Sequence, residues 1–150
     1  MSKKILLVED DGATLSIVEA LDEIYGYDLY KTTNNWSYVS SWLERKPGIR
    51  NFHALVFDLK VSAYKLKIYS EKSYNEENDL SPSLYFVEHF IVPNYPEMKE
   101  RVILTSGFSD EMQMNYEHKT GRLLTDDYMF IDKLESRSFS KLVEMLDTLD

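Results

Sequence analysis

The sequence predicts an α/β fold in which a doubly wound, five-stranded parallel sheet lies between two layers of helices. Short continuous apolar runs recur along the chain, and such runs are typical of strands covered on both faces. Stretches with apolar residues three or four apart, typical of amphipathic helices, lie between them. Strands that alternate with helices form parallel sheets through right-handed crossovers. The chain has 150 residues, 43% of them hydrophobic, which suits one domain over residues 1–150 with one packed core.

The first part of the chain contains three predicted strands and two predicted helices. The strands cover residues 5–8, 27–33 and 54–57. The first helix ends at Gly26, and its apolar stripe consists of Leu15, Val18, Leu21 and Ile24. The second helix begins after Asn35 as a candidate N-cap and closes at Pro47-Gly48, and its apolar residues are Trp36, Val39, Trp42 and Leu43.

An insert at residues 61–80 interrupts the alternation. Its first half, residues 64–69, alternates apolar residues with lysine like an edge strand, and its second half is polar. Ser81 is then a candidate N-cap with Pro82 in the first turn, for a helix that is expected to end before Pro93 and to carry Leu84, Val87, Phe90 and Ile91. Strands follow at 101–104 and 128–131, separated by a weak helix at 109–118 that Gly121 ends. The clearest amphipathic helix comes last and carries Phe139, Leu142, Val143, Leu146 and Leu149.

Composition excludes several classes of protein. Without cysteine there is no disulfide framework and no thiolate metal site. The aliphatic runs are far shorter than the roughly 20 residues that span a bilayer, and the N-terminus does not have the pattern of a signal peptide. A net charge of -9 argues against a protein that binds nucleic-acid phosphates. We therefore expect a cytoplasmic protein with neither a membrane nor a nucleic acid as partner.

Polar side chains follow the predicted buried strands at their carboxyl ends, where parallel sheets bind ligands. The set consists of Glu9, Asp10, Asp11, Asp58, Thr105, Ser106 and Lys133. Each residue alone has an ordinary explanation as a helix cap, a turn residue or a solvated cation. Their combination at strand ends of the same polarity indicates a functional site.

Phosphoryl transfer to a carboxylate requires this set of groups. A hard cation such as Mg²⁺ takes oxygen ligands and would offset the clustered negative charge, with Asp10 and Asp58 as direct ligands and Glu9 acting through water. Asp58 would then be the nucleophile that forms an acyl phosphate. The Thr105 hydroxyl and the Lys133 ammonium would stabilise charge on the transferring phosphoryl group.

The sequence resembles the receiver domain of two-component response regulators over essentially its whole length. The segments "ILLVEDD", "ALVFDL", "VILTSG" and "YMFIDK" match the family's first, third, fourth and fifth strands. The resemblance implies a flavodoxin-like, three-layer α/β/α fold with strand order 2-1-3-4-5. It implies phosphorylation on Asp58 and a switch aromatic at Phe130. It also implies a Mg²⁺ or Mn²⁺ site formed by Glu9, Asp10, Asp58 and the backbone carbonyl of Lys60.

The resemblance also implies what the protein works with. The phosphoryl donor would be a histidine kinase or a histidine phosphotransfer protein, and the output would be an unidentified downstream protein, with a second copy of the chain as a further candidate partner. Such a module signals, and as an enzyme it catalyses only its own phosphorylation and dephosphorylation. The sequence departs from the family at Leu134, where a proline is common, and in the insert after Asp58.

Two alternatives remain open on the residues alone. One is a receiver-like scaffold that binds partners without being phosphorylated. The other is an aspartate-nucleophile phosphohydrolase of the haloacid dehalogenase kind, which uses a second carboxylate two residues after the nucleophile. In this chain Lys60 occupies that position, which argues against the hydrolase.

Overall fold

A five-stranded parallel sheet forms the centre of the protein, whose computed structural model describes residues 2–9, 19–33, 35–61 and 81–149. The order of the strands is β2-β1-β3-β4-β5, and all four pairings are parallel. The strands are β1 (Lys4–Val8), β2 (Asp28–Thr32), β3 (Phe52–Asp58), β4 (Val102–Ser106) and β5 (Met129–Asp132). This arrangement confirms the predicted doubly wound α/β fold and its strand order.

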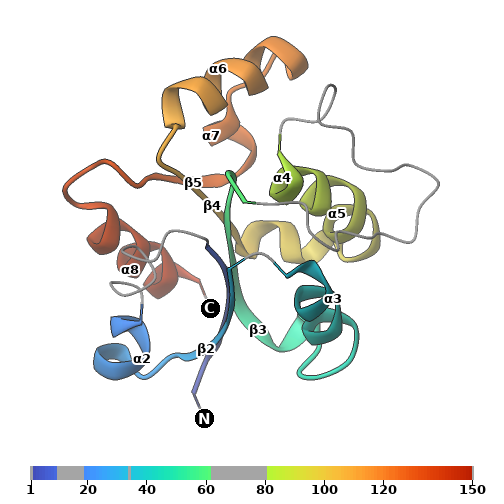
Figure 1. The fold of residues 1–150 in the computed structure, drawn as a ribbon, viewed down its shortest axis with the longest axis vertical. Helices are drawn as coiled ribbons and strands as arrows, with labels where there is room; N and C mark the ends of the chain where they lie inside the picture. Colours follow the sequence, from blue (N-terminus) through green and yellow to red (C-terminus); the bar gives the residue numbers. More distant parts are fainter. Residues whose placement is uncertain (1, 10–18, 34, 62–80, 150) are drawn as a thin grey trace.

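Helices cover both faces of the sheet (Figure 1). One face carries α2 (Ala20–Tyr25) and α8 (Ser138–Thr148). The other carries α3 (Trp36–Glu44) and the helical segment that begins with α4 (Pro82–Phe86). Side chains of α6 (Ser109–Thr120) and α7 (Leu124–Asp127) pack into that second layer as well. Because the helices pack against the faces of the sheet, the ends of the strands are left for a site.

The core consists of two apolar clusters, one on each face of the sheet. Successive side chains of a strand point to opposite faces, so Leu6 and Val8 belong to the cluster under α3, whereas Ile5 and Leu7 belong to the cluster under α8. All seven residues of β3 are buried. This central strand is therefore held on both faces, and it delivers Asp58 from a firmly packed position.

Local sequence signals set several helix ends as predicted. The Asn35 side chain accepts a hydrogen bond from the backbone N–H of Ser37, and the Ser81 hydroxyl accepts one from Leu84. Gly26 and Gly121 end α2 and α6 with φ of 72° and 74°. These left-handed conformations strain residues that have a Cβ, which explains glycine at both positions.

Two expectations about helices are wrong. Ile24 is 70% exposed, because it lies about 60° around the helix from the buried Leu21 and faces away from the sheet. The helix from Pro82 does not end before Pro93. It continues through a π-helical turn, η2 (Val87–Ile91), into α5 (Val92–Asn94). The wider turn bonds the Val92 N–H to the Val87 carbonyl, and Pro93 follows it directly.

Three short helical segments were not predicted from the sequence. They are η1 (Ile49–Asn51), η3 (Pro96–Arg101) and α7. Each is too short to show an apolar period. The predictions for Leu15 and Val18, and for an edge strand at 64–69, lie outside the described residues. Within the described part of the chain, no helix has both the length and the apolar character that a bilayer crossing requires.

Candidate phosphoacceptor site

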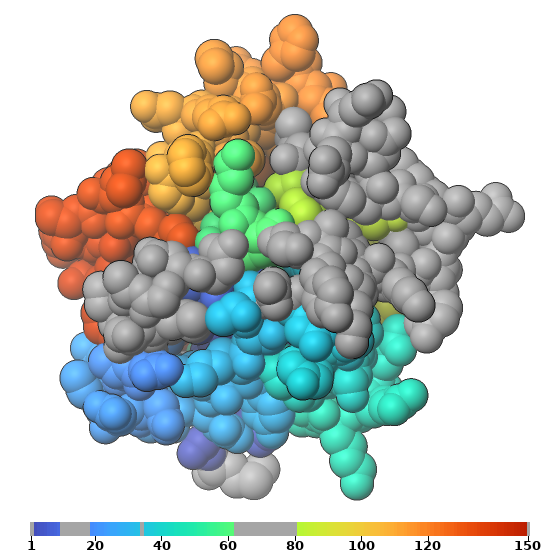
Figure 2. Space-filling model, viewed as in Figure 1, coloured from blue at the N-terminus to red at the C-terminus, as the bar shows by residue number. Residues whose placement is uncertain are grey.

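Four strands and the residues just after them bring the described candidate residues to one edge of the sheet. Glu9 follows β1, Asp58 ends β3, Thr105 lies in β4 and Lys133 follows β5. Asp58 and Thr105 are register partners on neighbouring strands. The short segment that directly follows β3, in green, lies near the centre of the face shown in Figure 2. The fold thus brings together residues that are up to 124 positions apart along the chain.

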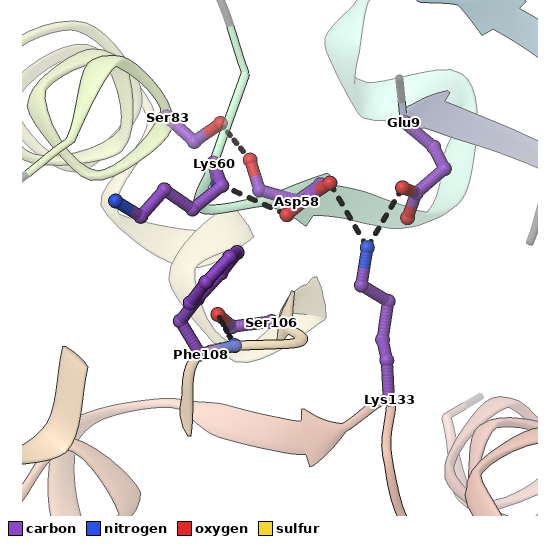
Figure 3. A network of polar contacts seen from close by, with 7 residues as sticks. All are labelled: Glu9, Asp58, Lys60, Ser83, Ser106, Phe108 and Lys133. Carbon is purple, nitrogen blue, oxygen red and sulfur yellow. Dashed lines mark hydrogen bonds and ion pairs between the residues drawn. The ribbon is translucent and has the colours of Figure 1, made fainter. Parts of the chain in front are cut away.

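The Lys133 ammonium bridges two buried carboxylates (Figure 3). Its Nζ donates to Glu9 Oε1 at 2.8 Å and to Asp58 Oδ2 at 3.0 Å. Glu9 is 1% exposed and Asp58 is 2% exposed. Two carboxylates that share one ammonium leave an excess of negative charge in a place that water does not reach.

The pKa values of the site reflect this imbalance. Burial raises the pKa of Glu9 to about 7, and its hydrogen bond to Asp58 adds to the rise against the opposing effect of Lys133. Burial alone would lower the pKa of Lys133, but the hydrogen bond to Glu9 and the charge of Asp58 raise it above its ordinary value. The site therefore favours the uptake of further positive charge, either as a proton or as a cation.

The donor set fits a hard divalent cation. Carboxylate oxygens are the ligands that Mg²⁺ prefers, and the cation would supply the missing positive charge. The described residues contain no group of three or more metal-ligating side chains, and Asp10 lies outside them. Glu9 and Asp58 are thus the two predicted ligands whose side chains the structure describes. All four predicted ligands, with Asp10 and the Lys60 carbonyl, stay predictions.

Two adjacent residues of β4 carry buried hydroxyls, and within the described residues only one of these hydroxyls has a hydrogen-bond partner. Thr105 Oγ1 is buried and has no hydrogen-bond partner among the described residues. Ser106 Oγ, also buried, accepts a hydrogen bond from the Phe108 backbone N–H at 2.8 Å. A buried polar group without a partner costs free energy. The Thr105 hydroxyl is therefore ready to bond to an oxygen that arrives beside Asp58.

Sequence reasoning missed the contacts that hold Asp58 in place. The Ser83 hydroxyl donates to the Asp58 backbone carbonyl at 2.6 Å, and the Lys60 backbone N–H donates to Asp58 Oδ1 at 3.0 Å (Figure 3). The Lys60 ammonium lies 5.0 Å from the centre of the Phe108 ring, over its face. The sequence assigned the helix cap to Ser81 correctly, but nothing in it shows that Ser83 faces β3.

Phe130, the predicted switch aromatic, is half-buried in β5. It is the register partner of Leu104, the residue before Thr105, and it packs against the core cluster under α3. Phe130 thus lies on the strand next to Thr105, one residue out of register with it. The structure does not test its role as a switch.

Comparison with known proteins identifies the fold as that of response regulator receiver domains. A receiver domain protein from Methanospirillum hungatei is 20% identical, with a TM-score of 0.57 and coverage of 98% of this chain and 95% of that chain. The receiver domain of a sensor histidine kinase from Pseudomonas aeruginosa is 17% identical, with a TM-score of 0.58 and coverage of 99% and 98%. That structure has a magnesium ion coordinated in its active site cleft.

A bacteriophytochrome response regulator is a third similar structure, 15% identical with a TM-score of 0.58, and the match covers 100% of this chain and 96% of that one. No protein-family model matches the sequence, and no curated protein matches it significantly. The likeness is therefore one of fold, which bears out the resemblance noted from the four strand segments.

Proposed function

We propose that this chain is a receiver module of a two-component phosphorelay, spanning residues 1–150 as one domain and accepting a phosphoryl group on Asp58. The observation that carries the proposal is the Lys133 ammonium shared by the Glu9 and Asp58 carboxylates, beside a Thr105 hydroxyl that has no partner among the described residues. A nucleophile, a cation and a hydroxyl donor thus lie at one strand edge. Phosphoryl transfer needs these groups in that arrangement.

The step transfers a phosphoryl group from the phosphohistidine of a histidine kinase or phosphotransfer protein. The N–P bond breaks, an O–P bond to an Asp58 carboxylate oxygen forms, and the departing ring keeps the electron pair and takes up a proton. The Lys60 N–H and the Ser83 hydroxyl hold Asp58 in orientation. Lys133 can stay paired with Glu9 while its other N–H groups turn to the phosphoryl oxygens.

A divalent cation, Mg²⁺ or Mn²⁺, held by Glu9, Asp58, Asp10 and the Lys60 carbonyl would neutralise charge on the phosphoryl oxygens. The Thr105 hydroxyl then bonds to a phosphoryl oxygen and moves toward it. That movement opens space for Phe130, so the outcome is a changed surface for a downstream protein or a second copy of the chain.

The test is intact-mass measurement after incubation with acetyl phosphate and Mg²⁺. We expect an alkali-labile mass increase of one phosphoryl group in the wild type, none in Asp58→Asn, and none in EDTA. Asp126→Asn makes the same change at an exposed acid on α7 and should keep the adduct. A wild type without adduct would overturn the proposal and leave a receiver-like scaffold. An adduct that persists in Asp58→Asn would place the acceptor elsewhere.

A further inference from the structure

A basic hollow lies at the amino-terminal edge of the sheet, opposite the acidic site. Its volume is about 500 Å³, and its lining includes Lys3, Lys4, Arg50 and Arg101. No acidic residue lines it in the described part of the chain, although the whole chain carries a net charge of -9. Four cations thus face one small space in a protein with an excess of acids.

The fold itself gathers these cations. Lys4 begins β1 and is the register partner of Phe52, which begins β3 directly after η1. Arg50 lies in η1, and Arg101 ends η3 just before β4. Because the strands are parallel, their amino ends meet at the edge that Asp58 does not share. Seven residues of β3 place the hollow roughly 20 Å from Asp58.

The hollow is partly preorganised. Arg101 Nη1 donates to the His53 carbonyl at 3.0 Å, which ties its guanidinium to the start of β3. The His53 ring is itself fixed, since its Nε2–H donates to the Leu146 carbonyl at 2.7 Å. Holding cationic side chains in place before binding reduces the entropy lost when a ligand arrives.

Among the described residues, two acids form ion pairs with cations of the hollow. Arg50 pairs with Glu97 at 2.9 Å, but both side chains are at least half exposed, so this pair contributes little and can rearrange. Lys4 lies 3.9 Å from Asp28, at the limit of an ion pair. A ligand with several negative oxygens would find two guanidinium groups and two ammonium groups, and guanidinium binds phosphate in a bidentate way.

We infer that this hollow binds a small anion with two or more phosphoryl groups. Its volume falls in the range of small-molecule sites, and a single monoanion would engage only part of the cationic lining. The inference is independent of phosphorylation on Asp58, because it concerns different residues at the other end of the strands.

Calorimetric titration with inorganic tripolyphosphate in EDTA tests the inference. EDTA removes divalent cations that would carry the probe to the acidic site, and Asp58→Asn should bind with unchanged affinity. The double variant Lys3→Gln/Arg50→Gln changes two exposed side chains and should lose at least tenfold in affinity. Higher salt should weaken wild-type binding, since much of it is charge attraction.

The matched control is Lys119→Gln/Lys141→Gln, which removes the same charge from α6 and α8. It should bind tripolyphosphate like the wild type. Equal losses in both double variants would show diffuse attraction instead of a site and would overturn the inference, as would absence of wild-type binding. Citrate binding as tightly as tripolyphosphate would overturn the preference for phosphoryl groups.

Discussion

Removal of the Thr105 hydroxyl should stabilise the unphosphorylated, metal-free protein. Thr105 is 6% exposed, and its Oγ1 has no hydrogen-bond partner within the described residues. Burial of an unpaired hydroxyl costs about 1–3 kcal/mol. Thr105→Val keeps the shape and the β-branching that suits a strand, so the free energy of unfolding should rise by about 1–2 kcal/mol. The backbone hydrogen bond from Leu59 N–H to the Thr105 carbonyl is unaffected.

Ser106→Ala is the matched control, because it removes a buried hydroxyl from the next residue of the same strand. That hydroxyl has a partner, so its loss should lower the free energy of unfolding by about 1 kcal/mol. Urea unfolding in EDTA, followed by tryptophan fluorescence, to which Trp36 packed on Phe57 contributes, measures both changes. If Thr105→Val destabilises the protein as much as Ser106→Ala does, the Thr105 hydroxyl has a partner and the reasoning fails.

Two further substitutions test the charged groups of the protein, one in the candidate site and one at the end of α7. Lys133→Met leaves two buried carboxylates without their shared ammonium, and it should lower the free energy of unfolding by about 3 kcal/mol at pH 8 in EDTA. Urea unfolding with Mg²⁺ in place of EDTA should restore part of this loss. A loss that Mg²⁺ does not change would contradict the proposed cation site. Asp127 accepts hydrogen bonds from the Tyr116 hydroxyl and the Arg122 guanidinium, which hold its pKa below the ordinary value. The ionised carboxylate stabilises the fold fully above the ordinary carboxyl pKa, and this contribution is lost as the pH falls through the lowered pKa. Asp127→Asn should therefore lower the free energy of unfolding by about 1 kcal/mol at pH 6.5 and by less at pH 3.5. An equal difference at both pH values would refute this sign.

The sheet could be predicted because its signals are local and strong. Runs such as residues 54–57 are apolar without a break, and β3 is indeed buried along its whole length. The helical predictions failed where tertiary structure decides. Pro93 reads as a stop in the sequence, yet a π-helical turn ahead of it lets the helix continue. Ile24 has helical spacing from Leu21 but faces away from the sheet.

The residues of the candidate site could be predicted because strand ends of one polarity meet at one edge. Their pairing could not. The sequence shows that Lys133 reaches this edge, but only the fold shows that it contacts Glu9 and Asp58 together. The hydrogen bond from Ser83 to Asp58 joins a helix to a strand across a long stretch of chain, and no local pattern reports such a contact.

That hydrogen bond has a practical consequence for protein engineering. The chain leaves the site through Lys60 and the buried Val61, and it returns through Ser81 and Ser83 to the same aspartate. A peptide or fluorescent domain inserted between these anchors would therefore start and finish beside Asp58, the proposed phosphoacceptor. Longer loops cost little extra closure entropy, roughly 0.6 kcal/mol per doubling of length. The position is thus a natural splice point for a reporter that would sense the proposed phosphorylation at its own attachment site.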